Sequence, residues 1–324
     1  MIEAPLVCLN GHPAGALDWR CGSCGAPIEF VHLPPFDADQ IRSGDWSLWR
    51  YGAMLPVKPR LTLGEGMTAL IPVQMPEGDV YAKLEYQNPT GSYKDRGIAV
   101  LVNHLIAHRV GEVIEDSSGN AGASLATYTA AARIHARIFA PAHAPAVKKR
   151  LIKQFAELVE VEGPRAATTA ACLQAAHSTV YASHAWNPYF VAGQMTAAWE
   201  VWEQLGRKVP DALVCPVGQG GLFLGFARGF RALLEAGLIA RLPRLYAVQA
   251  AACDPLVRAW ESGADTPAPV DGLPTLADGI VIGNPVRGAE VLRMIRQSNG
   301  MALRVDENSI REAQRTLTGR GLLV

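Results

Sequence analysis

Short apolar stretches with strand-like spacing alternate with amphipathic stretches along most of the chain. The strand candidates are Val80–Glu85, Glu112–Glu115, Ala136–Ala140, Leu158–Val161, Thr179–Ala182, Ala212–Val217 and Leu245–Gln249. The helix candidates between them are residues 98–108, 120–132, 144–155, 166–177, 196–205, 221–236 and 254–261. This regular alternation is typical of α/β proteins with largely parallel sheets.

A chain of 324 residues is longer than one ordinary hydrophobic core supports, so we predict two domains. The segment Glu261–Pro274 is rich in Gly and Pro and is the predicted linker. Residues 33–60, rich in Pro, Trp and Arg, are predicted to form an irregular arm packed over the core.

The charge balance argues against nucleic-acid and membrane-surface partners, because Lys plus Arg and Asp plus Glu both number 30. No apolar run approaches the length of a membrane span, and the first residues do not resemble a signal peptide. The six cysteines are too unevenly placed for a disulfide framework. We therefore expect a cytoplasmic protein that acts on a small molecule.

The N-terminal segment carries a candidate zinc site. Cys21 and Cys24 form a Cys-x2-Cys-Gly knuckle, and Cys8 and His12 are the residues that would complete a tetrahedral set. A second Cys-x2-Cys is absent, so a former zinc ribbon that has lost its metal remains an alternative.

The segment Asn88–Gly97 joins a strand candidate to a helix candidate and contains Lys94. Its Asn-Pro and Thr-Gly pairs favour a turn, so Lys94 is predicted just before the helix from Ile98. A helix start carries partial positive charge and favours the neutral amine that a Schiff-base lysine needs. An exposed loop lysine is the alternative.

Two glycine-bearing turns follow other strand candidates. Ser117–Gly122 offers small hydroxyl groups and free backbone N–H groups at a helix start, which suits a carboxylate. Gly218–Gly221 allows the close backbone approach that phosphate binding requires, although an ordinary strand-to-helix connection has the same appearance.

Taken in order, these motifs resemble those of the threonine synthases, which are fold-type II pyridoxal-phosphate enzymes of the tryptophan synthase β-like superfamily. The matching segments are Leu63–Thr68, Asn88–Gly97, Ser117–Gly122, Asn187–Tyr189, Gly193–Gln194, Pro210–Asp211, Pro216–Gly221 and Leu317–Leu322. The resemblance covers nearly the whole chain and includes the zinc-ribbon-like start.

The resemblance implies that Lys94 binds pyridoxal 5'-phosphate covalently and that Asn120 hydrogen-bonds its 3′-oxygen. It implies a contact between Thr318 and the pyridine nitrogen. The implied substrate-binding residues are Ser117, Ser118, Gly119 and Asn120, and the implied phosphate-binding residues are Gly218, Gln219, Gly220 and Gly221. After the substrate has displaced it, the free Lys94 amine would move the Cα proton.

The resemblance also implies a domain arrangement. Each domain would be an open, mostly parallel sheet flanked by helices. Residues 1–32 would form the zinc-ribbon-like segment, residues 33–97 and 195–324 the large cofactor-binding domain, and residues 98–194 the small substrate-side domain. A homodimer is the implied assembly.

The sequence departs from the family where threonine synthases hold the substrate phosphate. Phe190 stands in place of the expected arginine, Met195 in place of a lysine and Ala192 in place of a glutamate. Loss of the two cationic groups argues against O-phosphohomoserine as substrate. The alternative is that Lys148 or Lys149 supplies the missing charge.

Two further departures concern the cofactor side. Gln219 stands where related loops often have glycine, which is tolerable if its side chain points away from the phosphate. Residues Asp306–Gln314 resemble a late helix of the family and Arg315–Leu322 its final strand and turn, but the segment between them is missing. Either that segment is deleted or the sequence omits residues there.

These observations predict a pyridoxal-phosphate-dependent lyase that deprotonates Cα of a small amino acid, hydroxylated or phosphorylated, with β or γ elimination or replacement. Threonine synthase, a threonine or serine dehydratase, and a β-replacement synthase resembling cysteate or cysteine synthase are the alternatives within this class. An inactive scaffold without cofactor is a further alternative, and a nucleotide-binding protein would leave Lys94 without a role.

Overall fold

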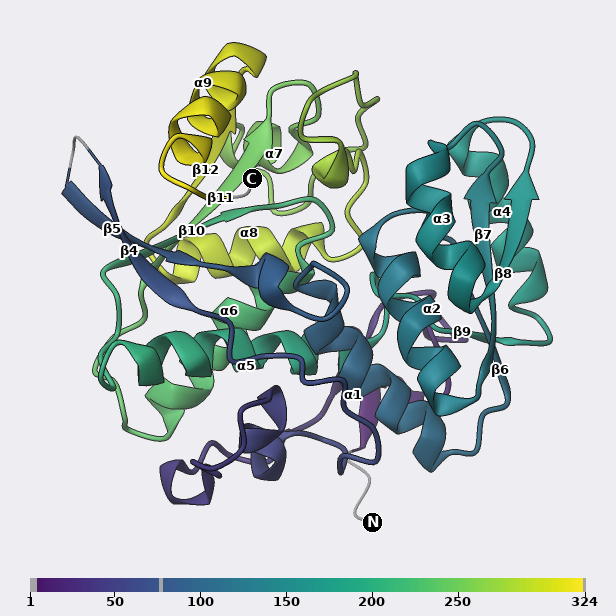
Figure 1. Ribbon diagram of the computed structural model, residues 1–324, viewed down its shortest axis with the longest axis horizontal. Coiled ribbons are helices and arrows are strands. Elements are labelled where there is room, and N and C mark those ends of the chain that lie inside the picture. The colour runs from purple at the N-terminus through teal and green to yellow at the C-terminus, as the bar shows by residue number, and fades with distance from the viewer. Residues whose placement is uncertain (1–4, 76–77, 323–324) are drawn as a thin grey trace. The chain divides into compact units, whose positions relative to one another are not determined.

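The computed structural model describes residues 5–322 except 76–77, and leaves the side chains of 79, 147 and 148 undescribed. The chain divides into two compact units (Figure 1). Unit 1 contains Met1–Ala69 and Leu84–Ala197, and unit 2 contains Leu70–Lys83 and Ala198–Val324.

Unit 1 is built on a four-stranded parallel sheet of order β8-β7-β6-β9. The strands are β6 (Glu112–Glu115), β7 (His135–Pro141), β8 (Glu157–Val161) and β9 (Val180–Tyr181). The helices are α1 (Lys94–Ala107), α2 (Asn120–Ala132), α3 (Ala146–Phe155), α4 (Arg165–Ala175) and α5 (Pro188–Gln204), of which α5 belongs to unit 1 up to Ala197. The central strands are buried on both faces, as expected of a parallel sheet covered by helices.

The N-terminal segment adds a small antiparallel sheet of order β2-β1-β3. Its strands are β1 (Leu6–Cys8), β2 (Pro13–Ala14) and β3 (Ile28–Phe30), and the short 3₁₀ helices η1 (Ala38–Gln40), η2 (Leu48–Met54) and η3 (Glu85–Gln87) follow. In η2 the apolar side chains of Leu48, Trp49 and Tyr51 are buried. The Trp49 indole N–H donates to the buried carboxylate of Glu65 at 2.8 Å, so the irregular arm is packed over the core as predicted.

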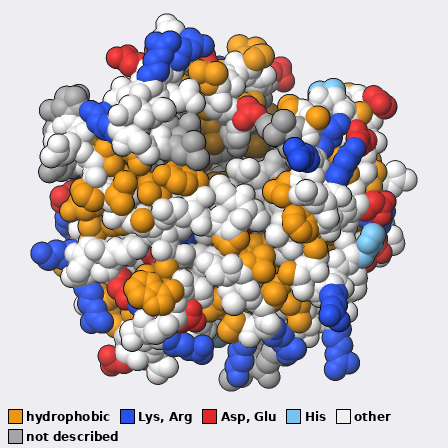
Figure 2. All heavy atoms as spheres, in the orientation of Figure 1, with side chains coloured by type: hydrophobic (Ala, Val, Ile, Leu, Met, Phe, Trp, Pro, Cys, Tyr) orange, Lys and Arg blue, Asp and Glu red, His pale blue; other side chains and the backbone are white. Residues whose placement is uncertain are grey.

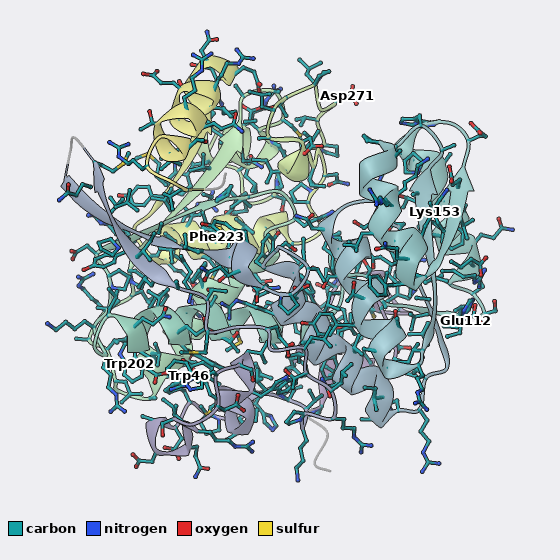
Figure 3. All side chains as sticks on the ribbon, viewed as in Figure 1. Trp46, Glu112, Lys153, Trp202, Phe223 and Asp271 are labelled. Atoms are coloured by element: carbon teal, nitrogen blue, oxygen red, sulfur yellow. The ribbon has the colours of Figure 1, made fainter. Side chains whose placement is uncertain are left out.

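Unit 2 contains a three-stranded parallel sheet of order β10-β11-β12 and a separate antiparallel hairpin, β4-β5. The strands are β4 (Leu70–Met75), β5 (Gly78–Lys83), β10 (Ala212–Pro216), β11 (Arg244–Ala250) and β12 (Met301–Val305). The helices are α6 (Gly221–Glu235), α7 (Pro255–Glu261), α8 (Gly288–Gln297), α9 (Glu307–Thr318) and the 3₁₀ helix η4 (Asp278–Ile280). Apolar side chains of α6, such as the buried Phe223 labelled in Figure 3, form the core of this unit.

The α/β fold with parallel sheets flanked by helices is confirmed, and the bounds of β6 and α2 agree with the predicted ones. Several predicted bounds are wrong. Helix α1 begins at Lys94 itself instead of Ile98, and α5 begins at Pro188 instead of residue 196. In both cases the helix starts inside a turn-like sequence whose side chains are fixed by tertiary contacts.

The chain after Asp306 also differs from the prediction. Helix α9 runs without a break through Gln314 and Arg315 to Thr318, so the expected final strand over Arg315–Leu322 is wrong. Its amphipathic spacing and the Asp306 cap, which accepts from the Ser309 N–H at 2.8 Å, favour one helix. Helix α8 and strand β12 were not predicted.

The two units group the chain differently from the predicted domains. Residues 33–69 and 84–97 lie in unit 1 together with residues 98–194. The Asn103 side chain of α1 explains this grouping, because it accepts from the backbone N–H of Arg60 and of Leu61 and donates to the Leu61 carbonyl. These hydrogen bonds attach the arm to α1. The predicted domains describe which residues would bind the cofactor and the substrate, whereas the two units describe how the chain packs, so the predicted domains stay a prediction.

Lys and Arg side chains are interspersed with Asp and Glu over the face shown in Figure 2, which agrees with the zero formal net charge. Among the described residues, no helix combines the length and the apolar character needed to cross a bilayer.

Candidate active site

Lys94 is the first residue of α1 and lies in unit 1. Its Nζ lies 4.8 Å from the centre of the Tyr93 ring and 5.5 Å from the centre of the Phe190 ring. The side chain is half-buried. An amine in this position is accessible to a ligand and rests on aromatic faces, which fits a reactive lysine better than a freely exposed loop lysine.

Asp95 fixes the turn that precedes Lys94. Its carboxylate accepts from the Thr90 backbone N–H at 2.7 Å and from the Thr90 hydroxyl at 2.6 Å. It also accepts from the Ser124 hydroxyl on α2 at 2.5 Å. Burial raises the pKa of Asp95, while these hydrogen bonds act in the opposite direction. The carboxylate therefore joins the turn, α1 and α2 at the base of the lysine.

Arg96 anchors the other side of Lys94. Its guanidinium is fully buried and makes a bidentate pair with Glu85, with both N–O distances at 2.7 Å. It also donates to the hydroxyls of Thr68 and Thr196. The two residues that follow Lys94 thus both have structural roles, which agrees with the prediction that the lysine is the reactive group of this motif.

Helices α1 and α5 approach closely because two glycines meet there. A side chain at Gly97 would come within 2.4 Å of the Phe190 ring, and one at Gly193 within 2.2 Å of the Arg96 carbonyl oxygen. The Gln194 amide donates to the Tyr93 carbonyl at 3.1 Å. This close packing fixes the ring of Phe190 beside Lys94.

The Ser117–Gly122 turn connects β6 to α2 within the same unit. A Cβ at Gly122 would lie 1.8 Å from the Ser117 carbonyl oxygen, so only glycine allows this turn. Ser117, Ser118 and Gly119 are half-buried, and Asn120 is exposed at the first position of α2. The first N–H groups of a helix have no partner within it and attract anions. The turn therefore suits a substrate carboxylate.

The glycine turn Gly218–Gly221 lies in unit 2 between β10 and α6. Gly220 has φ +88°, and a Cβ there would lie 2.6 Å from the Val291 side chain. The side-chain carbonyl oxygen of Gln219 accepts from the Val286 N–H at 3.1 Å. The Gln219 side chain is thus held by Val286, which agrees with the expectation that it points away from a phosphate at the start of α6.

Thr318 is the last residue of α9 in unit 2 and is exposed. Neither the helical backbone nor the exposure supports a contact with a buried pyridine ring, so the role of Thr318 remains a prediction from resemblance. Of the predicted site residues, Lys94 and Ser117–Asn120 lie in unit 1, and Gly218–Gly221 and Thr318 lie in unit 2.

A pair near Lys94 that no sequence motif indicated is formed by Glu115, which is buried, and His184, which is half-buried. His184 Nδ1 lies 2.9 Å from Glu115 Oε1, and the Glu115 side chain is 1% exposed. Glu115 ends β6 and His184 follows β9, the neighbouring parallel strand. Carboxyl ends of adjacent parallel strands are the usual ligand-binding edge of an α/β sheet, and that rule would have found the pair.

The residues that stand in place of the arginine, glutamate and lysine expected from the resemblance lie in α5. Phe190, Ala192 and Met195 are all buried. Lys149, one of the alternative cations, donates to the Ala142 carbonyl and to Glu160, both at 2.7 Å. It is therefore engaged elsewhere, and the side chain of Lys148 lies outside the described part of the structure.

The family described as "Pyridoxal-phosphate dependent enzyme" matches residues 61–324, which is most of the chain. This chain belongs to that family. Threonine synthase of Methanosarcina acetivorans is 32% identical to it over 314 residues, covering 92% of this chain and 77% of that protein. Threonine synthase of Methanocaldococcus jannaschii is 31% identical over 333 residues, covering 98% and 82%.

Solved structures share the fold of this chain. A threonine deaminase from T.th. has a TM-score of 0.66 at 26% identity and covers 78% of this chain and 81% of that one. Maize serine racemase, at 22% identity and a TM-score of 0.66, covers 77% and 74% and shows the shared fold alone. The chain is a pyridoxal-phosphate-dependent lyase that resembles threonine synthase, so the predicted resemblance, enzyme class and cofactor are confirmed.

Each unit carries groups that suit pyridoxal phosphate. Lys94 supplies an accessible amine at the start of α1. The start of α6, preceded by the positive-φ Gly220, supplies backbone N–H groups of the kind that bind phosphate. When bound, this cofactor supplies an electron sink for a carbanion at Cα.

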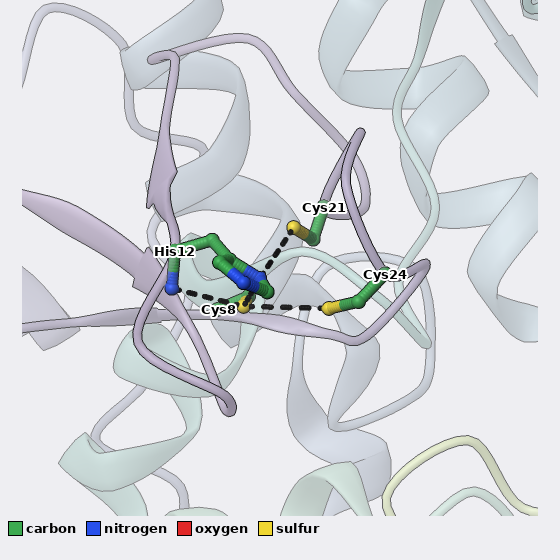
Figure 4. A group of neighbouring side chains, drawn as sticks. All are labelled: Cys8, His12, Cys21 and Cys24. Atoms are coloured by element: carbon green, nitrogen blue, oxygen red, sulfur yellow. Dashed lines mark hydrogen bonds between the residues drawn. The ribbon is translucent and has the colours of Figure 1, made fainter.

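The Cys/His cluster of the N-terminal segment is assembled as predicted (Figure 4). Cys8 Sγ lies 3.5 Å from His12 Nδ1 and 3.6 Å from Cys24 Sγ, and Cys21 Sγ lies 3.6 Å from His12 Nδ1. A tetrahedral zinc ion with bonds of about 2.3 Å to sulfur and about 2.0 Å to nitrogen separates its ligand atoms by roughly 3.5–3.8 Å. The Ala26 N–H lowers the pKa of Cys24 to about 7, which favours a thiolate.

Proposed function

We propose that this lyase eliminates the β-hydroxyl group of a small amino acid such as serine or threonine. The observation that carries the proposal is the buried Phe190 ring beside Lys94, where threonine synthases hold a phosphate-binding arginine. An aromatic ring offers no hydrogen-bond donor to a phosphate dianion, whereas a neutral hydroxyl substrate needs no such cation.

Each motif has a role in this proposal. Ser117, Ser118, Gly119 and the start of α2 orient the substrate through its carboxylate. The Lys94 amine removes the Cα proton and keeps it during elimination. Asn120 and Gly218–Gly221 hold the cofactor at its ring oxygen and its phosphate. Asp95 and Arg96 keep the lysine in place through their hydrogen bonds to the preceding turn and to Glu85.

Threonine synthase activity on O-phosphohomoserine is the second candidate function. It is favoured by relatives that are named threonine synthase at 31–34% identity and match most of this chain. On this alternative, a cationic side chain elsewhere in the chain would hold the substrate phosphate, because neither Phe190 nor Met195 carries a charge.

A panel of three substrates separates these functions. The purified protein, reconstituted with pyridoxal phosphate, is offered threonine, O-phosphohomoserine and O-phosphoserine, and oxo-acid, inorganic phosphate and threonine are measured. We expect oxo-acid from threonine and no release of phosphate from O-phosphohomoserine. Phosphate together with threonine from O-phosphohomoserine would establish the second candidate and overturn the first.

The Lys94→Ala variant is the control of this panel. We expect it to lose the visible absorbance of the bound cofactor and to lose turnover by about 10³-fold or more, because a general base alone contributes about 10²–10⁴-fold. A protein that stays colourless after reconstitution in both forms would favour the inactive scaffold.

We further propose that Cys8, His12, Cys21 and Cys24 hold a structural zinc ion. Metal analysis of purified protein should give one zinc per chain, and Cys21→Ser should abolish it. We also propose a homodimer, as the resemblance implies, and a cytoplasmic location, as the sequence predicts. The molar mass in solution tests the dimer.

A further inference from the structure

Beta elimination of a hydroxyl group requires a proton for the departing oxygen, and the residues assigned so far do not supply one. Lys94 gains a proton from Cα in this reaction, and Ser117 and Ser118 are occupied with the carboxylate. A phosphate leaving group would need no such help, but hydroxide is a poor leaving group near neutral pH. An acidic side chain near Lys94 would supply this proton.

The Glu115–His184 pair lies near Lys94 in unit 1. Glu115 precedes the Ser117 turn by two residues, so it belongs to the segment that would hold the substrate carboxylate. The His184 ring packs edge-on against Phe190 at 5.7 Å between ring centres, and Lys94 Nζ lies 5.5 Å from the same ring. His184 and Lys94 therefore both contact the Phe190 ring.

The surroundings of the pair favour the neutral form of both Glu115 and His184. Burial raises the pKa of Glu115 well above its usual range, and the neighbouring Asp116 raises it further. Burial lowers the pKa of His184 well below its usual range, and the charges of Lys94 and Arg165 lower it further. Glu115 Oε2 has no hydrogen-bond partner among the described residues, which would be costly for an ionised carboxylate. In this neutral form the Glu115 O–H would donate to His184 Nδ1, and His184 would carry its own proton on Nε2.

Charged and titratable groups from several elements surround the Glu115–His184 pair. The charged and titratable groups around the pair are Lys94 on α1, Asp116 after β6, Arg165 and Cys172 on α4, and Tyr181 on β9. Asp116 accepts from the Tyr181 hydroxyl at 2.6 Å and pairs with Arg165 at 3.0 Å. Lys94 is the member of this group that changes charge in the proposed reaction.

We propose that His184 is the general acid that protonates the leaving hydroxyl group, with Glu115 as the positioning residue that replaces its proton. The Cα–H bond breaks and its proton moves to Lys94, while its electron pair forms the Cα=Cβ bond. The Cβ–O bond breaks, and its electrons take the Nε2 proton of His184, which releases water. The Glu115 proton moves to Nδ1, and after release the Lys94 proton returns to the pair through solvent.

Electrostatics couples the two proton transfers. Lys94 becomes positive when it accepts the Cα proton, and a positive Lys94 lowers the pKa of both Glu115 and His184. The proton of the pair is therefore released most readily when the leaving group needs it. This inference rests on the proposed elimination of a hydroxyl group and names the residue that completes it.

The kinetic experiment uses a leaving group that needs no proton. We expect His184→Gln to lower oxo-acid formation from threonine by roughly 10²–10⁴-fold, the range typical of a general acid. The same variant should eliminate chloride from β-chloroalanine at close to the wild-type rate. Glu115→Gln should show the same selectivity with a smaller loss. The exposed His177 on the same unit provides the control His177→Gln, which should be unchanged with both substrates.

A spectroscopic experiment on the cofactor-free protein provides an independent measurement. The ¹⁵N histidine signal that disappears in His184→Gln is followed from pH 4 to pH 8. It should report neutral imidazole through about pH 6.5, where an ordinary histidine titrates. Its midpoint should rise in Lys94→Ala, because the positive charge is gone. An ordinary midpoint that Lys94→Ala does not move would overturn the coupling.

The outcomes separate this inference from the proposed function. Equal loss with threonine and β-chloroalanine in His184→Gln would show a structural role only and would overturn the general acid. Unchanged threonine turnover in His184→Gln would do the same while leaving the proposed function intact. A wild-type enzyme that acts on neither substrate would overturn both.

Discussion

At the scale of single residues, Lys94 owes its position to the two residues that follow it in the sequence. Asp95 binds the turn before the helix and α2, and Arg96 binds Glu85 within the core of unit 1. The motif therefore separates into one chemical residue and two residues that hold it. The proposed roles of Glu115 and His184 follow the same division, because Glu115 would position His184 and replace its proton.

Asp95→Asn tests this division. The NH2 group of the asparagine would face a hydrogen-bond donor of Thr90 or Ser124. At least one buried group would therefore lose its partner. We expect a loss of about 1–3 kcal/mol in the free energy of unfolding, measured by urea denaturation, together with weaker cofactor binding. Ser124→Ala removes a single hydrogen bond and should cost about 1 kcal/mol. Equal stability of Asp95→Asn and the wild-type protein would remove Asp95 from this role.

At the scale of elements, the sequence predicts those parts whose hydrophobic pattern is local. Strand β6 and helix α2 were predicted to the residue, because an apolar run ends at a glycine-bearing turn. The start of α5 was missed, because the buried Tyr189 and Phe190 directly follow an Asn-Pro pair, which by itself favours a turn. The His184–Glu115 contact joins residues 69 positions apart, and no local pattern contains it.

His104 on α1 makes the stability of unit 1 depend on pH. Its Nε2 lies 2.9 Å from the Ala16 carbonyl oxygen, and its ring stacks on Tyr189 at 3.7 Å. Burial lowers the pKa of His104 to about 4. The folded state therefore holds neutral His104 while the unfolded chain, with a pKa near 6.5, binds a proton. Its contribution to stability is complete above pH 6.5 and is lost as the pH falls towards 4.

The expected size of this loss is about 3 kcal/mol, since each pKa unit corresponds to about 1.4 kcal/mol. His104→Gln keeps a donor for the Ala16 carbonyl and cannot titrate. We expect the difference in unfolding free energy between this variant and the wild-type protein to change by that amount between pH 7 and pH 4 in urea titrations. The exposed His177→Gln serves as the control. Parallel pH profiles for His104→Gln and the wild-type protein would contradict the assignment.

At the scale of the whole molecule, the motifs attributed to the cofactor are distributed over both units. Lys94 and Asn120 belong to unit 1, and Gly218–Gly221 belong to unit 2. The sequence order of these motifs was enough to predict the family, although it did not give the grouping of residues 33–69 with unit 1. That grouping depends on side-chain contacts such as those of Asn103 with the arm, which the pattern of apolar positions does not encode.

Gly220→Ala tests the contribution of unit 2 without touching Lys94. The residue has φ +88°, and the added Cβ would lie 2.6 Å from the Val291 side chain, so the turn must change shape at the start of α6. We expect pyridoxal phosphate to bind at least about tenfold more weakly, which corresponds to about 1.4 kcal/mol. Equilibrium titration of the visible absorbance measures this change. Gly279→Ala, where the added Cβ meets no atom within 4 Å, is the matched control in the same unit. Undiminished cofactor affinity in Gly220→Ala would show that this turn does not hold the phosphate, and Lys94 would remain the residue on which the cofactor assignment depends.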